Sequence, residues 1–138
     1  MTQNEKELLL KDLCARVPYG VKYMRYSWDY EADQELPVIE TLECADKDGY
    51  INHRRVYTVD DIKPYLFPLS SMTEEQIQEY TYIVNYISSD DTENWVEGEF
   101  IYVEQFTQLM HFYHINHLDY MGLIPMGLAI DATGLNIY

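Results

Sequence analysis

The chain has few positive charges, few cysteines and no long apolar run. Of its 138 residues, nine are Lys or Arg and 24 are Asp or Glu, which gives a formal net charge of −15. None of the nine lies between Pro64 and Tyr138, a stretch that contains eleven acidic residues. A surface this negative repels phosphate groups and anionic lipids, so direct binding to nucleic acids or membranes is not expected.

The shortage of apolar runs and cysteines also excludes several classes of protein. The three leucines at 8–10 are flanked by acids and are shorter than the ~7 residues of a secretory signal. No window reaches the ~18 apolar residues of a membrane-spanning helix. Cys14 and Cys44 form no CxxC pair, so they are expected as reduced, small, buried side chains. We therefore expect a cytoplasmic protein.

Capping residues and apolar spacing predict three main helices. They lie near residues 5–16, 73–88 and 104–117. In the second helix Thr73 with Gln76 offers a capping box, and an apolar stripe of Ile77, Tyr80, Val84 and Ile87 follows.

Two shorter helical segments are also expected. Thr58 begins a helical turn that ends near Pro64, and Asp119 caps a short helix that runs through Ile124.

Between the first and second helices the chain favours β structure. Residues 21–28 are rich in Tyr, Val and Trp, and residues 29–35 contain four acids that indicate an exposed loop. Alternation before and after the turn at Asp48-Gly49 predicts a hairpin over residues 38–58.

The predicted elements indicate an α+β fold. It consists of an N-terminal helix, a small antiparallel sheet or barrel-like hairpin region, and a helical C-terminal half. We expect a single domain over residues 1–138, with a β-rich lobe at about 18–68 and a helical lobe at about 70–138.

Tyrosine is abundant, with 14 residues against four Phe. Because its hydroxyl needs water or a partner, some tyrosines are expected at the surface, where they favour protein contacts. The tyrosines considered for exposure are Tyr19, Tyr23, Tyr26, Tyr30, Tyr80, Tyr82, Tyr86, Tyr102 and Tyr138.

Three histidines spaced by three residues are the one candidate for a chemical site. His111 and His114 share a helix face and could reach one metal ion, with Glu104 or Asp119 completing the set. The alternative is that His114 and His117 pack at the edge of a tyrosine-rich core. We predict no metal and no cofactor, since the HExxH pairing is absent. No catalytic residue is assigned, because the sequence contains no GxSxG, GxGxxG or phosphate-binding loop.

Three segments resemble a group of uncharacterised small proteins from Bacteroidetes that are often found near mobile elements. They are EKELLLKDLCARVPYGVK from Glu5 to Lys22, VDDIKPYLFPLSSMTEE from Val59 to Glu75, and HLDYMGLIPMGLA from His117 to Ala129. The resemblance covers about 48 of 138 residues and implies a bacterial cytoplasmic setting. Phe67 and Met121 stand where the pattern of the group has Arg, and positions 125–126 read Pro-Met instead of Glu-Lys.

These observations lead to three hypotheses. The first is a non-enzymatic accessory factor that binds an unidentified protein through an acidic, tyrosine-bearing surface. The second is a nucleic-acid mimic that blocks a basic nucleic-acid-binding protein. The third is a metal-dependent enzyme that uses His111 and His114. The residues assigned to the interaction surface are Glu75, Glu79, Tyr82, Tyr86, Asp90 and Asp91.

Overall fold

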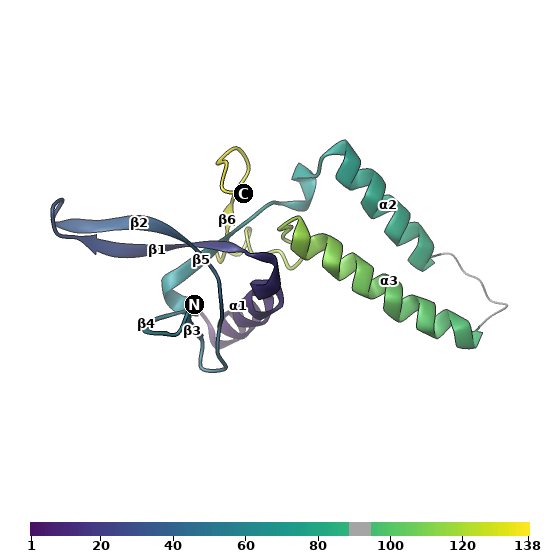
Figure 1. The fold of residues 1–138 in the computed structure, drawn as a ribbon, viewed down its shortest axis with the longest axis horizontal. Helices are drawn as coiled ribbons and strands as arrows, with labels where there is room; N and C mark the ends of the chain where they lie inside the picture. Colours follow the sequence, from purple (N-terminus) through teal and green to yellow (C-terminus); the bar gives the residue numbers. More distant parts are fainter. Residues whose placement is uncertain (89–94) are drawn as a thin grey trace.

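A computed structural model gives the fold, and it describes residues 1–88 and 95–138; the side chains of residues 54–56, 86–88 and 95–103 are not described. The α+β class is confirmed (Figure 1). The helices and 3-10 turns are α1 (Gln3–Arg16), η1 (Val17–Tyr19), η2 (Val59–Asp61), η3 (Leu69–Ser71), α2 (Glu74–Ser88) and α3 (Trp95–Ile115). The strands are β1 (Lys22–Asp29), β2 (Gln34–Thr41), β3 (Tyr50–Ile51), β4 (Arg54–Thr58), β5 (Ile62–Leu66) and β6 (Ile130–Asp131).

The first helix begins and ends where local chemistry requires it. Thr2 accepts a hydrogen bond from the Glu5 backbone, and the Glu5 carboxylate accepts one from the Thr2 backbone, which completes a capping box. After the η1 turn, Gly20 adopts the left-handed φ of 69° and ends the helical segment. The prediction for this helix is confirmed.

The central sheet has four strands in the order β2-β1-β5-β6. β1 is antiparallel to both β2 and β5, whereas β6 returns from the C-terminal segment and pairs parallel to β5. The sheet is therefore mixed. Residues 30–33 form the exposed turn between β1 and β2, as their acids predict.

The predicted hairpin over residues 38–58 is wrong in its pairing. The turn at Asp46–Gly49 exists, and Ala45 forms an isolated bridge with Ile51 beside it. However, the strand before the turn pairs with β1, while β3 pairs with β4 in a separate two-stranded sheet. β2 pairs with β1 because β1 is longer than β3 and allows more backbone hydrogen bonds. The residues of a turn do not indicate which of two strands the preceding strand pairs with.

The main core lies between α1 and the sheet. Leu9 and Leu13 of α1 are fully buried against Val21, Tyr23 and Leu42 from the β1–β2 region. Residues from the C-terminal segment, including Leu123 and Leu128, complete this cluster. The beginning and end of the chain therefore share one core.

The helices α2 and α3 form an antiparallel pair that extends from this body (Figure 1). Ile83, Phe112 and Leu118 are the buried apolar residues of its cluster in the described part of the chain. The Thr73–Gln76 capping box at the start of α2 is confirmed, with hydrogen bonds of 2.9 and 3.2 Å.

Three details of the helical predictions require correction. Ile77 is 47% exposed and Ile83 is buried instead, because α2 turns a slightly different face to α3. α3 begins at Trp95, well before residue 104. The short helix after Asp119 does not form. The Asp119 carboxylate instead accepts hydrogen bonds from the Leu123 and Ile124 backbones, at 2.8 and 2.9 Å, within a series of turns.

Among the described residues, no helix combines the length and the apolar character required to cross a bilayer.

Candidate functional site: a cleft between the two long helices

A cleft of about 520 Å³ lies between α2, α3 and the η1 turn. Tyr19 contributes from η1, Glu79 and Tyr82 from α2, and His111 and His114 from α3. The two helices and η1 come from three separate stretches of the chain, so only the tertiary fold assembles this group. The cleft contains four of the residues that the sequence had singled out as site candidates.

The rim and the floor of the cleft differ in polarity. Glu79 is exposed, and Tyr82 is 68% exposed, so the α2 side is open to solvent. Ile83 and Phe112 are buried and form part of the apolar lining. The site therefore has an acidic, aromatic entrance over an apolar base.

Each histidine of the HxxHxxH motif contacts a tyrosine. His111 Nδ1 lies 3.0 Å from the Tyr19 hydroxyl, and His114 Nε2 lies 2.8 Å from the Tyr120 hydroxyl. His117 lies beyond the end of α3 with a left-handed φ of 53°, and its ring stacks on Tyr138 at 3.7 Å between centroids.

The structure does not bring these histidines together as a metal centre. Within residues 1–88 and 95–138, no group of three or more His, Cys, Asp or Glu side chains is placed to hold a metal ion. Asp119, considered as a completing ligand, is occupied by backbone N–H groups. Glu104 is exposed on α3.

Burial keeps two of the histidines neutral. It lowers the pKa of His114 to about 4, with smaller contributions from the positive charge of Arg16 and from His111. It also lowers the pKa of His117 to about 4, helped by Arg16 and Lys22. Neither imidazole carries a charge at neutral pH, so neither opposes a cation entering the cleft.

A buried arginine joins α1 to the segment that follows α3. Arg16 is fully buried and pairs with Asp12 at 2.7 Å, one helical turn away. Its Nη2 donates to the Leu118 carbonyl at 2.6 Å, and its guanidinium lies 5.2 Å from the centre of the Tyr120 ring. Because Tyr120 also contacts His114, the network continues to the wall of the cleft.

Burial dominates the electrostatics of this pair. It raises the pKa of Asp12 above the ordinary aspartate value even though Arg16 opposes the shift. Neither residue was predicted as part of a site, although their i, i+4 spacing on a predicted helix indicated that they could pair. What the spacing could not show is that the pair is buried.

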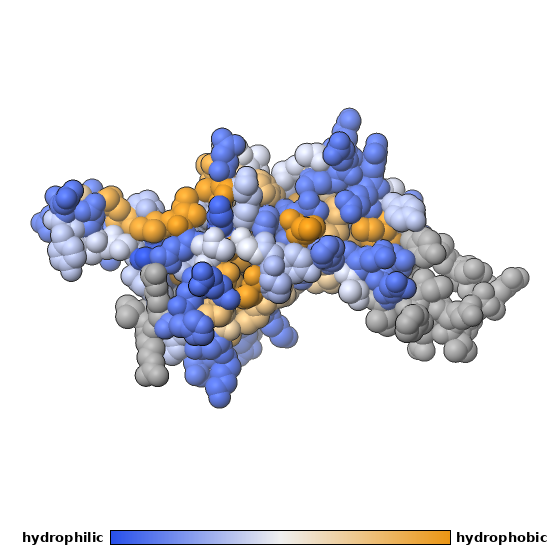
Figure 2. Space-filling model, in the orientation of Figure 1, coloured by the Kyte–Doolittle hydropathy of each residue, from blue (hydrophilic) through white to orange (hydrophobic). Residues whose placement is uncertain are grey.

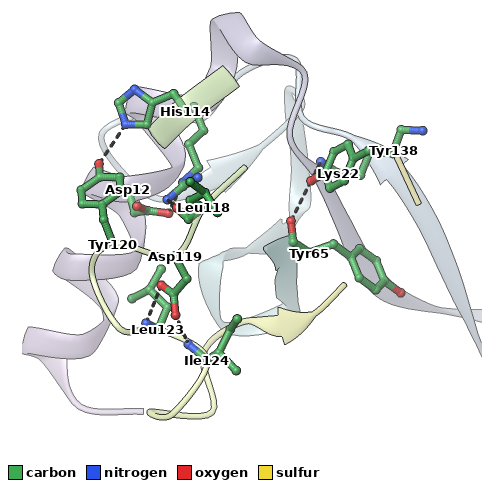
Figure 3. Close-up of polar contacts among 11 residues, drawn as sticks. Asp12, Lys22, Tyr65, His114, Leu118, Asp119, Tyr120, Leu123, Ile124 and Tyr138 are labelled. Atoms are coloured by element: carbon green, nitrogen blue, oxygen red, sulfur yellow. Dashed lines mark hydrogen bonds and ion pairs between the residues drawn. The ribbon is translucent and has the colours of Figure 1, made fainter. Parts of the chain in front are cut away.

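The C-terminal tyrosine fixes the last residues to the sheet (Figure 3). The Tyr138 hydroxyl donates to the Tyr65 carbonyl at 2.7 Å and accepts from the Lys22 backbone at 2.9 Å. Burial raises the pKa of Tyr138 to about 12. This tyrosine acts within the fold, and its ring forms the platform on which His117 stacks.

The residues assigned to the interaction surface separate into two sets. Glu75, Glu79 and Tyr82 lie on exposed positions of α2 at i, i+4 and i+7, so they share one side of the helix. Tyr86 belongs to the same helix, although its side chain is outside the described part. Asp90 and Asp91 lie outside the described residues.

The expectation that both cysteines are buried was wrong. Cys14 is exposed and Cys44 is half-buried, and both are free thiols. Cys14 follows Leu13 in the sequence, but it lies outside the side of α1 that carries the buried Leu9 and Leu13. The apolar spacing therefore assigned Cys14 to the core wrongly. Among the other tyrosines, Tyr26, Tyr30 and Tyr82 are well exposed, whereas Tyr23 is buried and donates its hydroxyl hydrogen to Glu40.

Comparison of the chain with protein-family models, curated proteins and solved structures finds no match.

Proposed function

We propose that this protein is a non-enzymatic accessory factor of a bacterial or mobile-element system, and that it binds a basic protein partner through the acidic, tyrosine-bearing side of α2. The observation that carries the proposal is the shared exposure of Glu75, Glu79 and Tyr82 beside an open cleft. A carboxylate next to aromatic rings is a favourable environment for an Arg or Lys side chain.

The charge of the surrounding segment supports this choice of partner. No Lys or Arg occurs after position 63, so α2 and α3 provide no cation of their own. Among the side chains that the structure describes, the ion pairs join Lys6 to Asp60, Arg16 to Asp12 and Arg25 to Glu40, all within the body. The carboxylates on α2 are therefore available to a partner's cations, and the neutral His114 at the cleft wall does not compete with them.

The experiment compares capture of host proteins by two matched variants. The test variant is Glu75→Gln/Glu79→Gln/Tyr82→Ser, and the control Glu43→Gln/Asp48→Asn removes the same charge from exposed positions of the body. Each protein is immobilised and exposed to extract of the host bacterium, and each captured protein is then titrated in purified form. We expect a basic partner whose affinity falls at least about tenfold for the test variant and stays unchanged for the control.

The same titration separates general interaction from nucleic-acid mimicry. Glu75 and Glu79 are one helical turn apart, at a spacing of about 6 Å along the helix. If these carboxylates imitate phosphates, duplex DNA competes with this protein for its partner. If DNA does not compete, the partner recognises the protein surface itself. Equal binding by wild type and test variant contradicts the proposal in both forms.

A further inference from the structure

The β1–β2 hairpin extends beyond the rest of the sheet as an arm (Figure 1). The pairing of β5 with β1 spans only the register from Tyr23 to Arg25. Beyond that point, residues 26–29 of β1 pair only with residues 34–37 of β2 among the described strands. A two-stranded ribbon is marginally stable in water unless one of its faces is packed against something.

One face of this arm is apolar and open to solvent. Met24, Tyr26 and Trp28 alternate along β1, and their partners across the ribbon are Ile39, Pro37 and Glu35. Tyr26, Trp28 and Ile39 are 53%, 48% and 48% exposed. Figure 2 shows hydrophobic surface along the arm. We call the face formed by these six residues the arm face.

The opposite face is already used within the chain. Arg25 points to that side, pairs with Glu40 at 2.6 Å and lies 4.7 Å from the centre of the Tyr57 ring. Tyr23 and Leu42 continue that side into the main core. Of the two faces of the ribbon, the arm face is therefore the one that leaves large apolar side chains exposed. A contiguous exposed apolar patch is unusual for a folded monomer.

We propose that the arm face packs against the arm face of a second copy of this chain, forming a two-fold symmetric dimer. Contact is by face and not by edge, because Pro37 on the edge strand β2 lacks the N–H group that edge pairing would use. Two sheets packed face to face bury their side chains in a layer about 10 Å thick.

Charge complementarity identifies a second copy as the occupant. The tip of the arm is acidic, with Asp29, Glu31, Asp33 and Glu35, whereas its base has an exposed Lys63 beside Met24. Lys22 also lies at the base, where its Nζ donates to the Ile137 carbonyl at 2.9 Å. Two arms packed antiparallel bring the acidic tip of each copy over the basic base of the other. A two-fold axis near Tyr26 satisfies both ends at once, as a symmetric interface requires.

The same arrangement keeps the most acidic parts of the two copies apart. The arm and the α2–α3 pair lie at opposite ends of the molecule (Figure 1). When the arms overlap in antiparallel orientation, the two helical pairs therefore point away from each other. A net charge of −15 per chain then opposes association less than it would in any side-by-side arrangement.

Sedimentation equilibrium of the full chain from about 1 µM to 1 mM tests the proposal, because this range covers weak and moderate dimers. We expect a monomer–dimer equilibrium whose dissociation constant rises at least about tenfold in Trp28→Ser/Ile39→Ser. The control Phe106→Ser removes a side chain of similar exposure from α3 and leaves the equilibrium unchanged. Lys63→Glu, which places an acid opposite the acidic tip, weakens the dimer severalfold.

A cysteine at the proposed axis gives a second measurement that does not depend on affinity. In a Cys14→Ser/Cys44→Ala background, we expect a bifunctional thiol reagent with a span of about 10 Å to cross-link two copies through Tyr26→Cys, because the facing strands lie about 10 Å apart. Tyr82→Cys, on α2, remains a monomer under the same conditions. A protein that is monomeric throughout the concentration range, or that cross-links equally at both positions, overturns the proposal.

Discussion

The body and the α2–α3 pair are stabilised in different ways. In the described part of the chain, the body buries apolar side chains from α1, the sheet and the C-terminal segment in one cluster, and fully buried residues such as Leu9, Leu13 and Leu66 lie at its centre. Among the side chains described for the helical pair and the segment after it, the buried members of the apolar cluster are Ile83, Phe112 and Leu118. Its segment also has acids without a single Lys or Arg. The body folds around apolar burial, and the helical pair depends more on how it is attached.

Part of that attachment is polar. The Phe67 N–H donates to the His117 carbonyl, and the Asp119 N–H donates to the Phe67 carbonyl, both at 2.8 Å. Arg16 adds its hydrogen bond to Leu118 from the side of α1. We call these residues the joint. Changes at the joint should therefore affect the helical pair more than the body, and three predictions address this difference.

The largest effect is expected from Arg16→Ala. The substitution leaves the Asp12 carboxylate buried without its counter-charge and the Leu118 carbonyl without this donor. Removing one member of a buried pair costs about 3–5 kcal/mol, so the free energy of unfolding should fall by that amount. Denaturant titration measures it, and hydrogen exchange should show α2 and α3 losing protection before the sheet.

The double variant Arg16→Met/Asp12→Leu serves as the control for Arg16→Ala. It removes both charges and fills the space with apolar groups, so part of the lost stability should return. If Arg16→Ala is as stable as wild type, the joint does not hold the two regions together.

A smaller, pH-dependent effect is expected from His117, which belongs to the joint, and from His114 beside it. In the unfolded chain a histidine has a pKa of about 6.5, whereas burial lowers the pKa of His114 and His117 to about 4 in the fold. As pH falls from about 6.5 toward 4, these two imidazoles become protonated in the unfolded chain but stay neutral in the folded chain. The stability from each histidine is therefore complete above pH 6.5 and lost on acidification, by on the order of 2 kcal/mol per group at pH 5.

The variant His114→Gln/His117→Asn tests this pH effect. Asn is chosen at position 117 because it tolerates the left-handed φ of 53° found there. Its unfolding free energy, compared with that of wild type between pH 7 and pH 4.5, should vary less with pH. Parallel pH profiles for the two proteins would show that these histidines titrate normally.

The smallest effect is expected from salt. The carboxylates between Pro64 and Tyr138 repel one another without cations of their own, and added salt screens that repulsion. Raising NaCl to physiological strength and beyond should increase the melting temperature by about 2–4 °C, which corresponds to roughly 1 kcal/mol. Hydrogen exchange should show the gain in α2 and α3 and little change in the sheet. If salt increases hydrogen-exchange protection equally in the sheet and in the α2–α3 pair, charge repulsion does not distinguish the two regions.

Local features of the sequence were sufficient to place α1 and α2, but not the start of α3. The capping residues Thr2 and Thr73 mark the starts of α1 and α2, and Gly20 marks the stop after η1. These signals act between residues three or four positions apart, so they operate whatever the rest of the chain does. Helical spacing also predicted the exposed acidic face of α2. Residue type predicted the turns at Asp48-Gly49 and at residues 30–33.

Strand partners and the candidate site depended on contacts that are distant along the chain. The strand after Gln34 joined β1 and not β3, because pairing is decided by competition among all available strands. The HxxHxxH spacing was equally compatible with a metal site and with core packing. Tyr19, 92 positions before His111, contributes a hydroxyl that contacts that histidine.

The sequence by itself determined the charge, the absence of cations after position 63, the limits of α1 and α2, and the abundance of tyrosine. Only the tertiary structure decided that Asp12 and Arg16 are buried, that Tyr138 is fixed beneath His117, and that the arm face is left open. The physical reason is the range of the interactions. Capping and turn formation depend on neighbouring residues, whereas burial depends on which surfaces meet, as when Arg16 reaches a carbonyl 102 residues away.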